Sequence, residues 1–265
     1  MREQSFKFGE LETRALFFLE EKEISTITSE DLAKALKISS NRANKLAWQL
    51  IRKNRLIRIK KGLFLFAPMR AGIAGNWSED NYFILDKVIQ GKPYYVSFLT
   101  AMHHYELTEQ IPLVVQVVTT AKVNSFSAIG SKFQFIKVRK LGKYKEEKIK
   151  GKNINFATQE QLIIDGLTYP KYCTGIIEVT KALWNAKLNF KELRTLVKDS
   201  KNVVQRRLGY LLEVLKRKES KLFEGKFAGL QWLDPSSTKK PIEVSKKWNL
   251  RVNLTDKELT YWMKT

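Results

Sequence analysis

The residues whose types and spacing best suit a chemical role lie between Lys37 and Lys61, and that role is recognition of a phosphate backbone. This stretch contains nine lysines and arginines and no acidic residue. The nine are Lys37, Arg42, Lys45, Arg52, Lys53, Arg55, Arg58, Lys60 and Lys61. An unopposed run of positive charge attracts a polyanion such as duplex DNA, whose phosphates supply much of the affinity of protein–DNA complexes.

Two sets of side chains within this stretch are expected to contact DNA. Serine, asparagine and arginine can hydrogen-bond to base edges in the major groove, and lysine neutralises phosphates. The set expected in the major groove is Ser40, Asn41, Arg42, Asn44 and Lys45. The set expected at the flanking backbone or in the minor groove is Arg58, Lys60 and Lys61.

A second candidate site is a metal-dependent nuclease centre near the end of the chain. Such a centre needs two carboxylates and a lysine that converge on a metal and a water, and Asp234, Glu243 and Lys246 come nearest to that set. On a strand, however, Glu243 and Ser245 share a face while Lys246 points the other way. The spacing therefore favours DNA binding, with a DNA-targeted nuclease as the alternative.

The remaining reactive residues do not form a recognisable site. His103 and His104 are adjacent and cannot both face one site on a helix, and Cys173 is distant from both. The sequence contains no metal-ligand spacing, no phosphate-binding loop and no dinucleotide-binding fingerprint. We therefore expect no catalytic residue, no metal and no cofactor, and we expect the protein not to be an enzyme.

A winged helix-turn-helix would present the basic residues, and residues 29–68 have its pattern. Five apolar residues repeat at the spacing of one helix face, which must be buried: Ala43, Leu46, Ala47, Leu50 and Ile51. A three-residue turn, Lys37–Ser39, separates this helix from the one before it. A hairpin with its tip at Lys60–Gly62 follows the helix. The alternative use of such a domain is contact with proteins alone.

Local signals place the ends of these elements. Thr28 with Asp31 should cap the first helix, and Ser39 or Ser40 the second. Residues 24–27 should form a short strand that pairs with the hairpin. The hairpin strands should be residues 55–59 and 63–66, with Ile57 and Ile59 on one face. Trp48 lies on the basic face and is expected to pack against the hairpin or the next domain.

Composition supports a nucleic-acid partner. The 265 residues carry a formal net charge of +21, which points to a polyanion; the alternative is a lysine-rich surface of the kind found in thermophiles. With Cys173 as the one cysteine, no internal disulfide can form, so a cytoplasmic protein is expected. The first ten residues are polar and no apolar run is long enough to span a membrane, so no membrane partner is expected.

The spacing of apolar residues that predicts the winged helix-turn-helix ends at residue 68. Residues 69–76 are small and read as a linker, so residues 1–68 and 77–265 are predicted to be separate domains. The fold class is therefore α+β, with an N-terminal winged helix-turn-helix followed by a larger mixed α/β domain.

Within the larger domain, a helix is expected from Ser78 to Gln90, and Thr158 with Gln161 should form a capping box. Residues 139–152 are lysine-rich and are expected to form a loop or hairpin, with a solvated surface loop favoured and a second nucleic-acid contact as the alternative. Asp165 is expected to be a helix cap or an ion-pair partner.

Three segments of the second part resemble AbiEi-type antitoxins. The run SFLTAMHHYELTEQIP (97–112) is similar to that family's His-x-x-Leu-Thr-x-Gln turn, with His104, Leu107, Thr108 and Gln110 in place. The run NFATQEQLIIDGL (155–167) resembles its Ala-Thr-x-Glu-x-x-Leu-Leu-Asp helix, and RRLGYLLE (206–213) its Arg-Leu-Gly-x-Leu-Leu-Glu helix. Tyr105 departs from the family's frequent glycine. The resemblance covers nearly the whole chain.

The resemblance implies a type IV toxin–antitoxin locus of the abortive-infection kind. The protein would be a transcriptional repressor that binds inverted repeats in its own promoter, as a monomer or dimer with two copies on the DNA. It would also counter a nucleotidyltransferase-like toxin, and direct contact with that toxin is not assumed. The charge pattern and the resemblance both predict double-stranded DNA as the partner, and the resemblance specifies promoter DNA.

Overall fold

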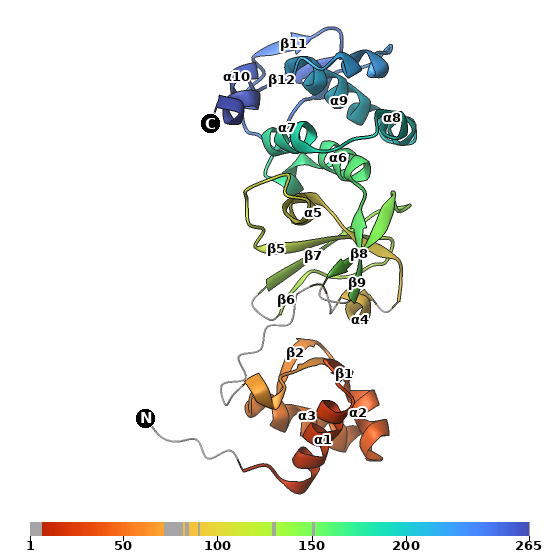
Figure 1. Ribbon diagram of the computed structural model, residues 1–265, viewed down its shortest axis with the longest axis vertical. Helices are drawn as coiled ribbons and strands as arrows, with labels where there is room; N and C mark the ends of the chain where they lie inside the picture. The colour runs from red at the N-terminus through yellow and green to blue at the C-terminus, as the bar shows by residue number, and fades with distance from the viewer. Residues whose placement is uncertain are drawn as a thin grey trace. The chain divides into compact units, whose positions relative to one another are not determined.

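The chain forms short helices and strands, partly in runs of one kind, and the fold is mixed α+β, as the sequence predicts (Figure 1). The structure is a computed structural model that describes residues 7–71, 82, 85–89, 91–128, 131–149 and 152–264. The chain divides into two units. The first comprises Met1–Gly91 with Asn124–Gln134, and the second comprises Lys92–Val123 with Phe135–Thr265.

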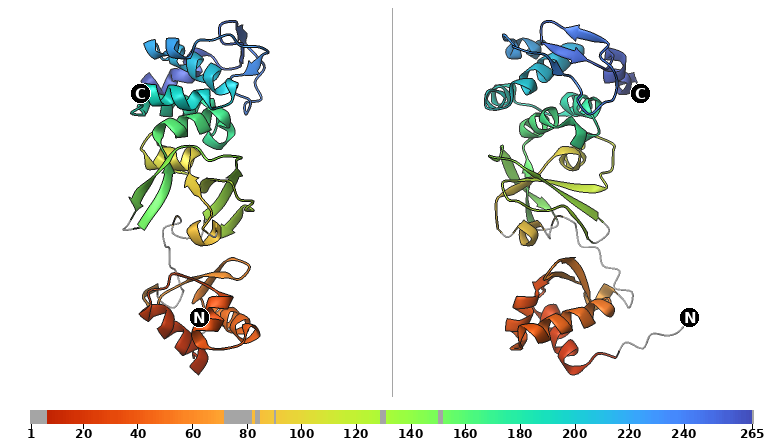
Figure 2. Two further views of the ribbon diagram at one scale, coloured as in Figure 1. Left: turned by 90° about the vertical axis from the view of Figure 1, so that its right-hand side faces the viewer. Right: turned by 180° about the vertical axis from the view of Figure 1, so that it is seen from behind.

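The first unit begins with three helices and a three-stranded sheet. Its elements in order are α1 (Glu10–Glu21), β1 (Thr26–Thr28), α2 (Ser29–Leu36), α3 (Ser40–Arg52), β2 (Leu56–Lys60) and β3 (Leu63–Phe66). A 3-10 turn at Met69–Ala71 and the short helix α4 (Leu85–Ile89) follow. Helices α1–α3 pack together on one side of the strands (Figure 2).

The predicted helix spacing and caps are present in this unit. The stripe on α3 faces the core, with Leu46 and Leu50 almost fully buried, and it packs against apolar residues of α1, α2, β2 and β3. The hydroxyl of Thr28 accepts the backbone N–H of Asp31 at 3.0 Å, and that of Ser39 accepts the N–H of Arg42 at 3.4 Å. Each cap satisfies a backbone donor that the helix cannot satisfy itself.

The sheet has the order β1-β3-β2, and it differs from the prediction in one detail. As expected, β1 pairs antiparallel with β3, and β2 and β3 form a hairpin. The pairing of β2 skips Ile59, which is a β-bulge. The bulge turns Ile59 inward beside Leu56, so these two residues are buried and Ile57 is only half-buried. The predicted pairing of Ile57 with Ile59 on one face is therefore wrong.

The second unit combines helices with a small sheet and most strands of a larger one, of which β6 (Phe126–Ala128) falls in the segment Asn124–Gln134 of the first unit. Its helices are α5 (Phe98–His104), α6 (Gln159–Thr168), α7 (Ile176–Asn185), α8 (Phe190–Lys198), α9 (Asn202–Val214) and α10 (Asp256–Thr260), with 3-10 turns at Pro170–Cys173, Lys218–Phe223 and Tyr261–Lys264. The small sheet has the order β10-β12-β11, from β10 (Gln231–Trp232), β11 (Glu243–Ser245) and β12 (Leu250–Val252).

The large sheet has six strands in the order β6-β7-β5-β4-β9-β8. These strands are β4 (Tyr94–Val96), β5 (Val114–Thr119), β6 (Phe126–Ala128), β7 (Ser131–Lys137), β8 (Tyr144–Ile149) and β9 (Lys152–Ala157). In the second unit α5 lies between this sheet and helices α6 and α7, and α8 and α9 lie farther out (Figure 1). The lysine-rich segment 139–152 is thus largely the β8–β9 hairpin and the loop before it.

Some predictions fall partly outside the described residues. Of the predicted linker, the structure describes only Met69–Ala71, and of the helix predicted from Ser78 to Gln90 it describes Tyr82 and α4. The predicted division into domains at residues 69–76 stays a prediction. Within the described part of the chain, no helix is long and apolar enough to cross a membrane.

The capping box predicted at Thr158 is only half formed. The hydroxyl of Thr158 accepts the N–H of Gln161 at 3.3 Å, as predicted. The N–H of Thr158 instead donates to the carbonyl of Lys143, and the side chain of Gln161 bonds to Lys143 and Asp165. The predicted capping box is therefore wrong in its second arm, because a tertiary contact has replaced the local one.

Candidate nucleic-acid interface

Helix α3 is held in place by its apolar side and by the turn that precedes it. Lys37 ends α2 in the left-handed conformation (φ 52°), and Ile38 packs against the core of the unit. Ser39 then caps α3. Because the turn is short and Ile38 anchors it, the start of α3 is fixed relative to α2.

The predicted major-groove residues all lie on the exposed part of α3. Ala43 and Leu46 face the core, and the five predicted residues alternate with them in exposed positions: Ser40, Asn41, Arg42, Asn44 and Lys45. They occupy the first two turns of the helix, where unsatisfied backbone N–H groups and the helix dipole also favour an anion. The structure therefore brings this set together on one element.

Trp48 follows on the same exposed side. Its side chain is 58% exposed, and the guanidinium of Arg52 lies 4.9 Å from the centre of its ring. That distance is typical of a cation–π contact. An indole this exposed gives no support to the expectation that Trp48 packs against the hairpin.

The three predicted contact residues of the hairpin, Arg58, Lys60 and Lys61, differ in their exposure to solvent. Gly62 has φ +75°, which the tight turn requires, and Arg58 and Lys61 are exposed beside it. Lys60 is half-buried, and its ammonium group donates to the carbonyl of Val88 at 2.9 Å. Burial also lowers the pKa of Lys60. A contact between Lys60 and DNA would first require this hydrogen bond to break, so the proposed interface does not include Lys60.

Two more members of the basic run are already engaged inside the first unit. Lys53 forms an ion pair with Glu12 at 2.5 Å. Arg55 is only 4% exposed, and its guanidinium donates to the carbonyl of Pro68 at 3.3 Å. The basic residues left exposed are Lys37, Arg42, Lys45, Arg52, Arg58 and Lys61, and among the described residues none of these six forms an ion pair. Their charge is available to an external anion.

The candidate nuclease residues of the second unit do not converge. Asp234 is 4% exposed, and one carboxylate oxygen accepts the N–H of Ile176 at 2.9 Å, at the start of α7. The other oxygen accepts the N–H of Ser236 at 2.8 Å. Glu243 and Lys246 are exposed. Asp234 thus caps a helix, and the described residues contain no group of three His, Cys, Asp or Glu residues that could hold a metal.

The two histidines and the cysteine also have structural surroundings. The ring of His104 stacks on Phe156 with centroids 3.9 Å apart, and burial lowers the pKa of His104. Cys173 is fully buried, and burial raises the pKa of its thiol. A neutral stacked imidazole and a protonated buried thiol both favour packing over catalysis.

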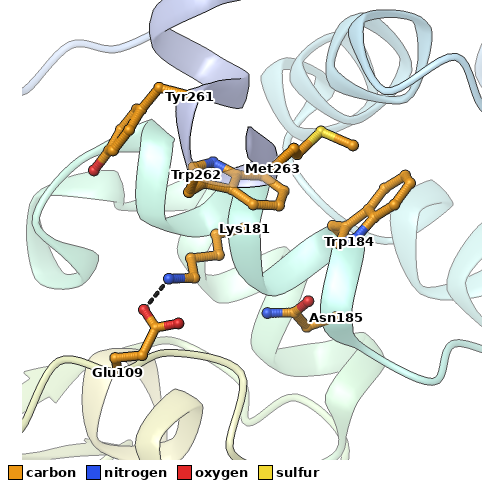
Figure 3. A pocket seen from close by; sticks show the side chains of 7 residues that line it. All are labelled: Glu109, Lys181, Trp184, Asn185, Tyr261, Trp262 and Met263. Atoms are coloured by element: carbon orange, nitrogen blue, oxygen red, sulfur yellow. Dashed lines mark hydrogen bonds and ion pairs between the residues drawn. The ribbon is translucent and has the colours of Figure 1, made fainter. Parts of the chain in front are cut away.

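A hollow of about 450 Å³ in the second unit was not predicted from the sequence (Figure 3). The side chains of Lys181 and Glu109 form an ion pair in it, and the rings of Trp184 and Trp262 lie 6.4 Å apart at an angle of 59°. Tyr261 is 60% exposed beside them. Its one lysine and one carboxylate neutralise each other, so the hollow offers aromatic surface and no free charged group.

Comparisons with known proteins bear on the fold. No family model matches the sequence, and no curated protein does. Among solved structures, the chain is similar to the RV2827C protein of Mycobacterium tuberculosis, with a TM-score of 0.73 and 13% sequence identity. The match covers 98% of this chain and 96% of that one. At this identity the likeness concerns the fold alone, and membership of the AbiEi-type family stays a prediction.

Sequence reasoning missed which cations are engaged and which carboxylates are buried. Lys60, Lys53 and Arg55 have the same residue types as their exposed neighbours, and only tertiary contacts distinguish them. Asp165 was expected to be a cap or an ion-pair partner, yet it accepts hydrogen bonds from Ser97 and Gln161 at 2.7 and 2.8 Å. The helical motif 155–167 marked Asp165 as notable, but it gave no sign of these partners.

Proposed function

We propose that the first unit is a winged helix-turn-helix that binds duplex DNA. In this proposal α2, the turn and α3 form the helix-turn-helix, α3 is the recognition helix, and the β2–β3 hairpin is the wing. The order of these elements and the three-stranded sheet are the features that support it. A basic helix–turn–helix with an adjoining basic hairpin occurs mainly in DNA-binding domains.

The observation that carries the proposal is the set of exposed, unpaired cations on α3 and the hairpin tip. Arg42 and Lys45 lie on the helix, and Arg58 and Lys61 lie on the hairpin. Arg42 is assigned to a base edge, since arginine can bond a guanine with two parallel hydrogen bonds. Lys45, Arg58 and Lys61 are assigned to phosphates, and Ser40, Asn41 and Asn44 complete the contact with the groove.

The biological role that fits this unit is a repressor and antitoxin of a toxin–antitoxin locus. This part of the proposal rests on the AbiEi-type resemblance of segments 97–112, 155–167 and 206–213. One such unit reads a single half-site, so repression would need two copies on an inverted repeat. The second unit would counter a nucleotidyltransferase-like toxin without being an enzyme itself, and direct contact with the toxin is not assumed. The protein would act in the cytoplasm.

Binding to the promoter of its own locus tests the proposal. Arg42→Ala should weaken binding to the promoter duplex by about 1–3 kcal/mol and relax base selection at one position. Lys45→Ala should weaken binding to promoter and random duplexes alike. Arg14→Ala combined with Lys7→Ala is the matched control, because both residues are exposed, lie outside α2, α3 and the hairpin, and form no ion pair among the described residues.

Fluorescence anisotropy with labelled promoter and scrambled duplexes measures these effects. Equal losses on both duplexes for Arg42→Ala would remove the base-reading assignment. Failure of the unaltered protein to bind either duplex would overturn the proposal and favour a domain that contacts proteins alone.

A further inference from the structure

A larger hollow, of about 890 Å³, lies entirely within the second unit. It is bounded by residues 137–143 at and after the end of β7, by one side of α6, and by residues 196–201 from the end of α8 to the start of α9. A volume of this size suits a small organic ligand. It is too small for a duplex, so it is a different kind of site from the proposed face on α3.

The rim of this hollow is positively charged. Its basic lining residues are Lys137, Arg139, Lys140, Lys143 and Lys201. Lys143 is paired with Glu192 at 2.7 Å, and Lys201 donates to the hydroxyl of Tyr169 at 3.3 Å. The first three are exposed, and within the described part of the chain they form no ion pair. One exposed carboxylate, Asp199, also lines the hollow, so a net positive charge remains among the exposed lining residues for an anion.

The floor of the hollow is polar, and Asp165 in it is half-buried. Asp165 accepts hydrogen bonds from the hydroxyl of Ser97 at 2.7 Å and from the side-chain amide of Gln161 at 2.8 Å. Tyr95, whose side chain is 1% exposed, also lines the hollow. A carboxylate offers about four acceptor positions and these two hydrogen bonds use two of them, so acceptor capacity remains for an N–H or O–H of a ligand.

The rim and the floor are fixed to each other. The side-chain oxygen of Gln161 accepts the N–H of Lys143 at 3.1 Å, which holds the rim segment against α6. A Cβ on Gly142 would lie 2.1 Å from the side chain of Gln161, so only glycine permits this approach. The hollow is therefore preorganised, and a ligand would not have to order it.

We propose that this hollow binds a nucleotide, with its phosphate held by Lys137, Arg139 and Lys140 and with a donor of its base or ribose bonded to Asp165. An anionic group and a hydrogen-bond donor on one small molecule match the charged rim and the acceptor on the floor. The nucleotide can be free, or it can be an unpaired nucleotide of a single strand. The site uses no residue of the proposed duplex interface.

Calorimetric titrations test the site on the full chain. The probes are AMP, GMP, CMP, UMP and inorganic phosphate, and a fluorescein-labelled single-stranded RNA hexamer is titrated by anisotropy. We expect at least one nucleotide probe to bind with one site per chain. Arg139→Ala combined with Lys140→Ala should weaken that binding at least tenfold. The control, Lys148→Ala combined with Lys226→Ala, removes the same charge from exposed positions outside the hollow and should change it less than twofold.

A second variant tests the ligand's contact with Asp165 separately from its contact with the basic rim. Asp165→Asn should weaken nucleotide binding at least fivefold and leave the binding of inorganic phosphate unchanged, because only the nucleotide reaches the floor. Circular dichroism melts establish that each variant is folded. If Asp165→Asn does not fold, the rim variants, altered at exposed positions, still decide the proposal.

Each outcome of these titrations either supports or overturns the proposed nucleotide site. Binding of mononucleotides identifies a free nucleotide, and binding of the hexamer alone identifies a single strand; both support the site. The proposal is overturned if no nucleotide probe binds, if inorganic phosphate binds as tightly as the nucleotides, or if the rim variant matches its control. It is also overturned if Arg42→Ala with Lys45→Ala abolishes the binding. That result would place the site in the first unit, whereas failure to bind promoter duplex would affect only the proposed repressor function.

Discussion

Replacing Lys61 by alanine should reduce the salt dependence of promoter binding, whereas replacing its neighbour Lys60 should not. The two residues have the same charge and adjacent positions in the hairpin. Lys61 is exposed at the tip, while the ammonium group of Lys60 is half-buried and bonded to the carbonyl of Val88. Each variant is therefore the matched control for the other.

The size of the effect follows from the number of phosphates that the protein neutralises. Each copy has four exposed, unpaired cations in the proposed interface: Arg42, Lys45, Arg58 and Lys61. If two copies bind, about eight phosphates are neutralised, and the slope of log K against log salt is about −7. Lys61→Ala removes one contact from each copy, so the slope should become about −5. Lys60→Ala should leave it near −7.

Anisotropy titrations of a promoter duplex at five salt concentrations measure the slopes, and sedimentation of the complex gives the number of copies. A slope about half as steep with one copy bound would refute the two-copy arrangement. An unchanged slope for Lys61→Ala would mean that the hairpin tip does not reach DNA. Equal flattening by both variants would mean that the hydrogen bond from Lys60 to Val88 does not persist in the complex.

Three further predictions concern other parts of the chain. Burial raises the pKa of Asp165 to about 6, although its hydrogen bonds act to lower the pKa. The other charged residues that line the same hollow are Lys137, Arg139, Lys140, Lys143, Lys201 and Asp199. The folded state thus holds more protons than the unfolded state between about pH 4 and 6, so this residue lowers stability as pH rises through that window, by at most about 3 kcal/mol. Urea unfolding of Asp165→Asn should lack this fall, and equal pH profiles of the variant and the unaltered protein would contradict it. Gly209→Ala should destabilise the protein by roughly 1–3 kcal/mol in thermal melts, because the added Cβ would lie 2.1 Å from the fully buried ring of Trp248. Gly9→Ala should destabilise it less, because the nearest atom to its added Cβ would be an oxygen of Glu12 at 3.8 Å. Finally, the variant with Arg42→Ala and Lys45→Ala should still protect cells from the neighbouring toxin expressed from a heterologous promoter, since the second unit keeps its own core; loss of protection by the folded variant would show that antitoxin action needs duplex binding.

Local signals were sufficient to predict most elements of the first unit. The stripe on α3 and the caps at Thr28 and Ser39 depend on residues within one or two helical turns. The strand before α2 could also be predicted, because Ile27 is an apolar residue between polar ones and pairs with the hairpin. Such features follow from periodicity and from backbone donors that must be satisfied nearby.

Tertiary contacts determined what the sequence did not reveal. The bulge at Ile59 depends on how β2 meets β3, and the engagement of Lys60 depends on Val88. The side chain of Gln161 bonds to Lys143 and Asp165, although its spacing from Thr158 suits a local capping box. In the same way, segments more than sixty residues apart along the chain line the larger hollow, so no local pattern could have indicated it.

Localised cleavage of the promoter by a reagent attached to α3 tests the central proposal most directly. Cys173 is fully buried, so an iron–EDTA reagent can be attached selectively to a cysteine introduced by Trp48→Cys, at a side chain that is 58% exposed on α3 and outside the proposed contacts. Phe17→Cys, at a side chain that is 71% exposed on α1, is the control. The proposal predicts hydroxyl-radical cuts confined to the inverted repeat for the reagent at position 48 and much weaker, unlocalised cutting for the reagent at position 17. Cleavage that is equal from both positions, or stronger from position 17, would contradict the assignment of α3 as the helix that reads DNA.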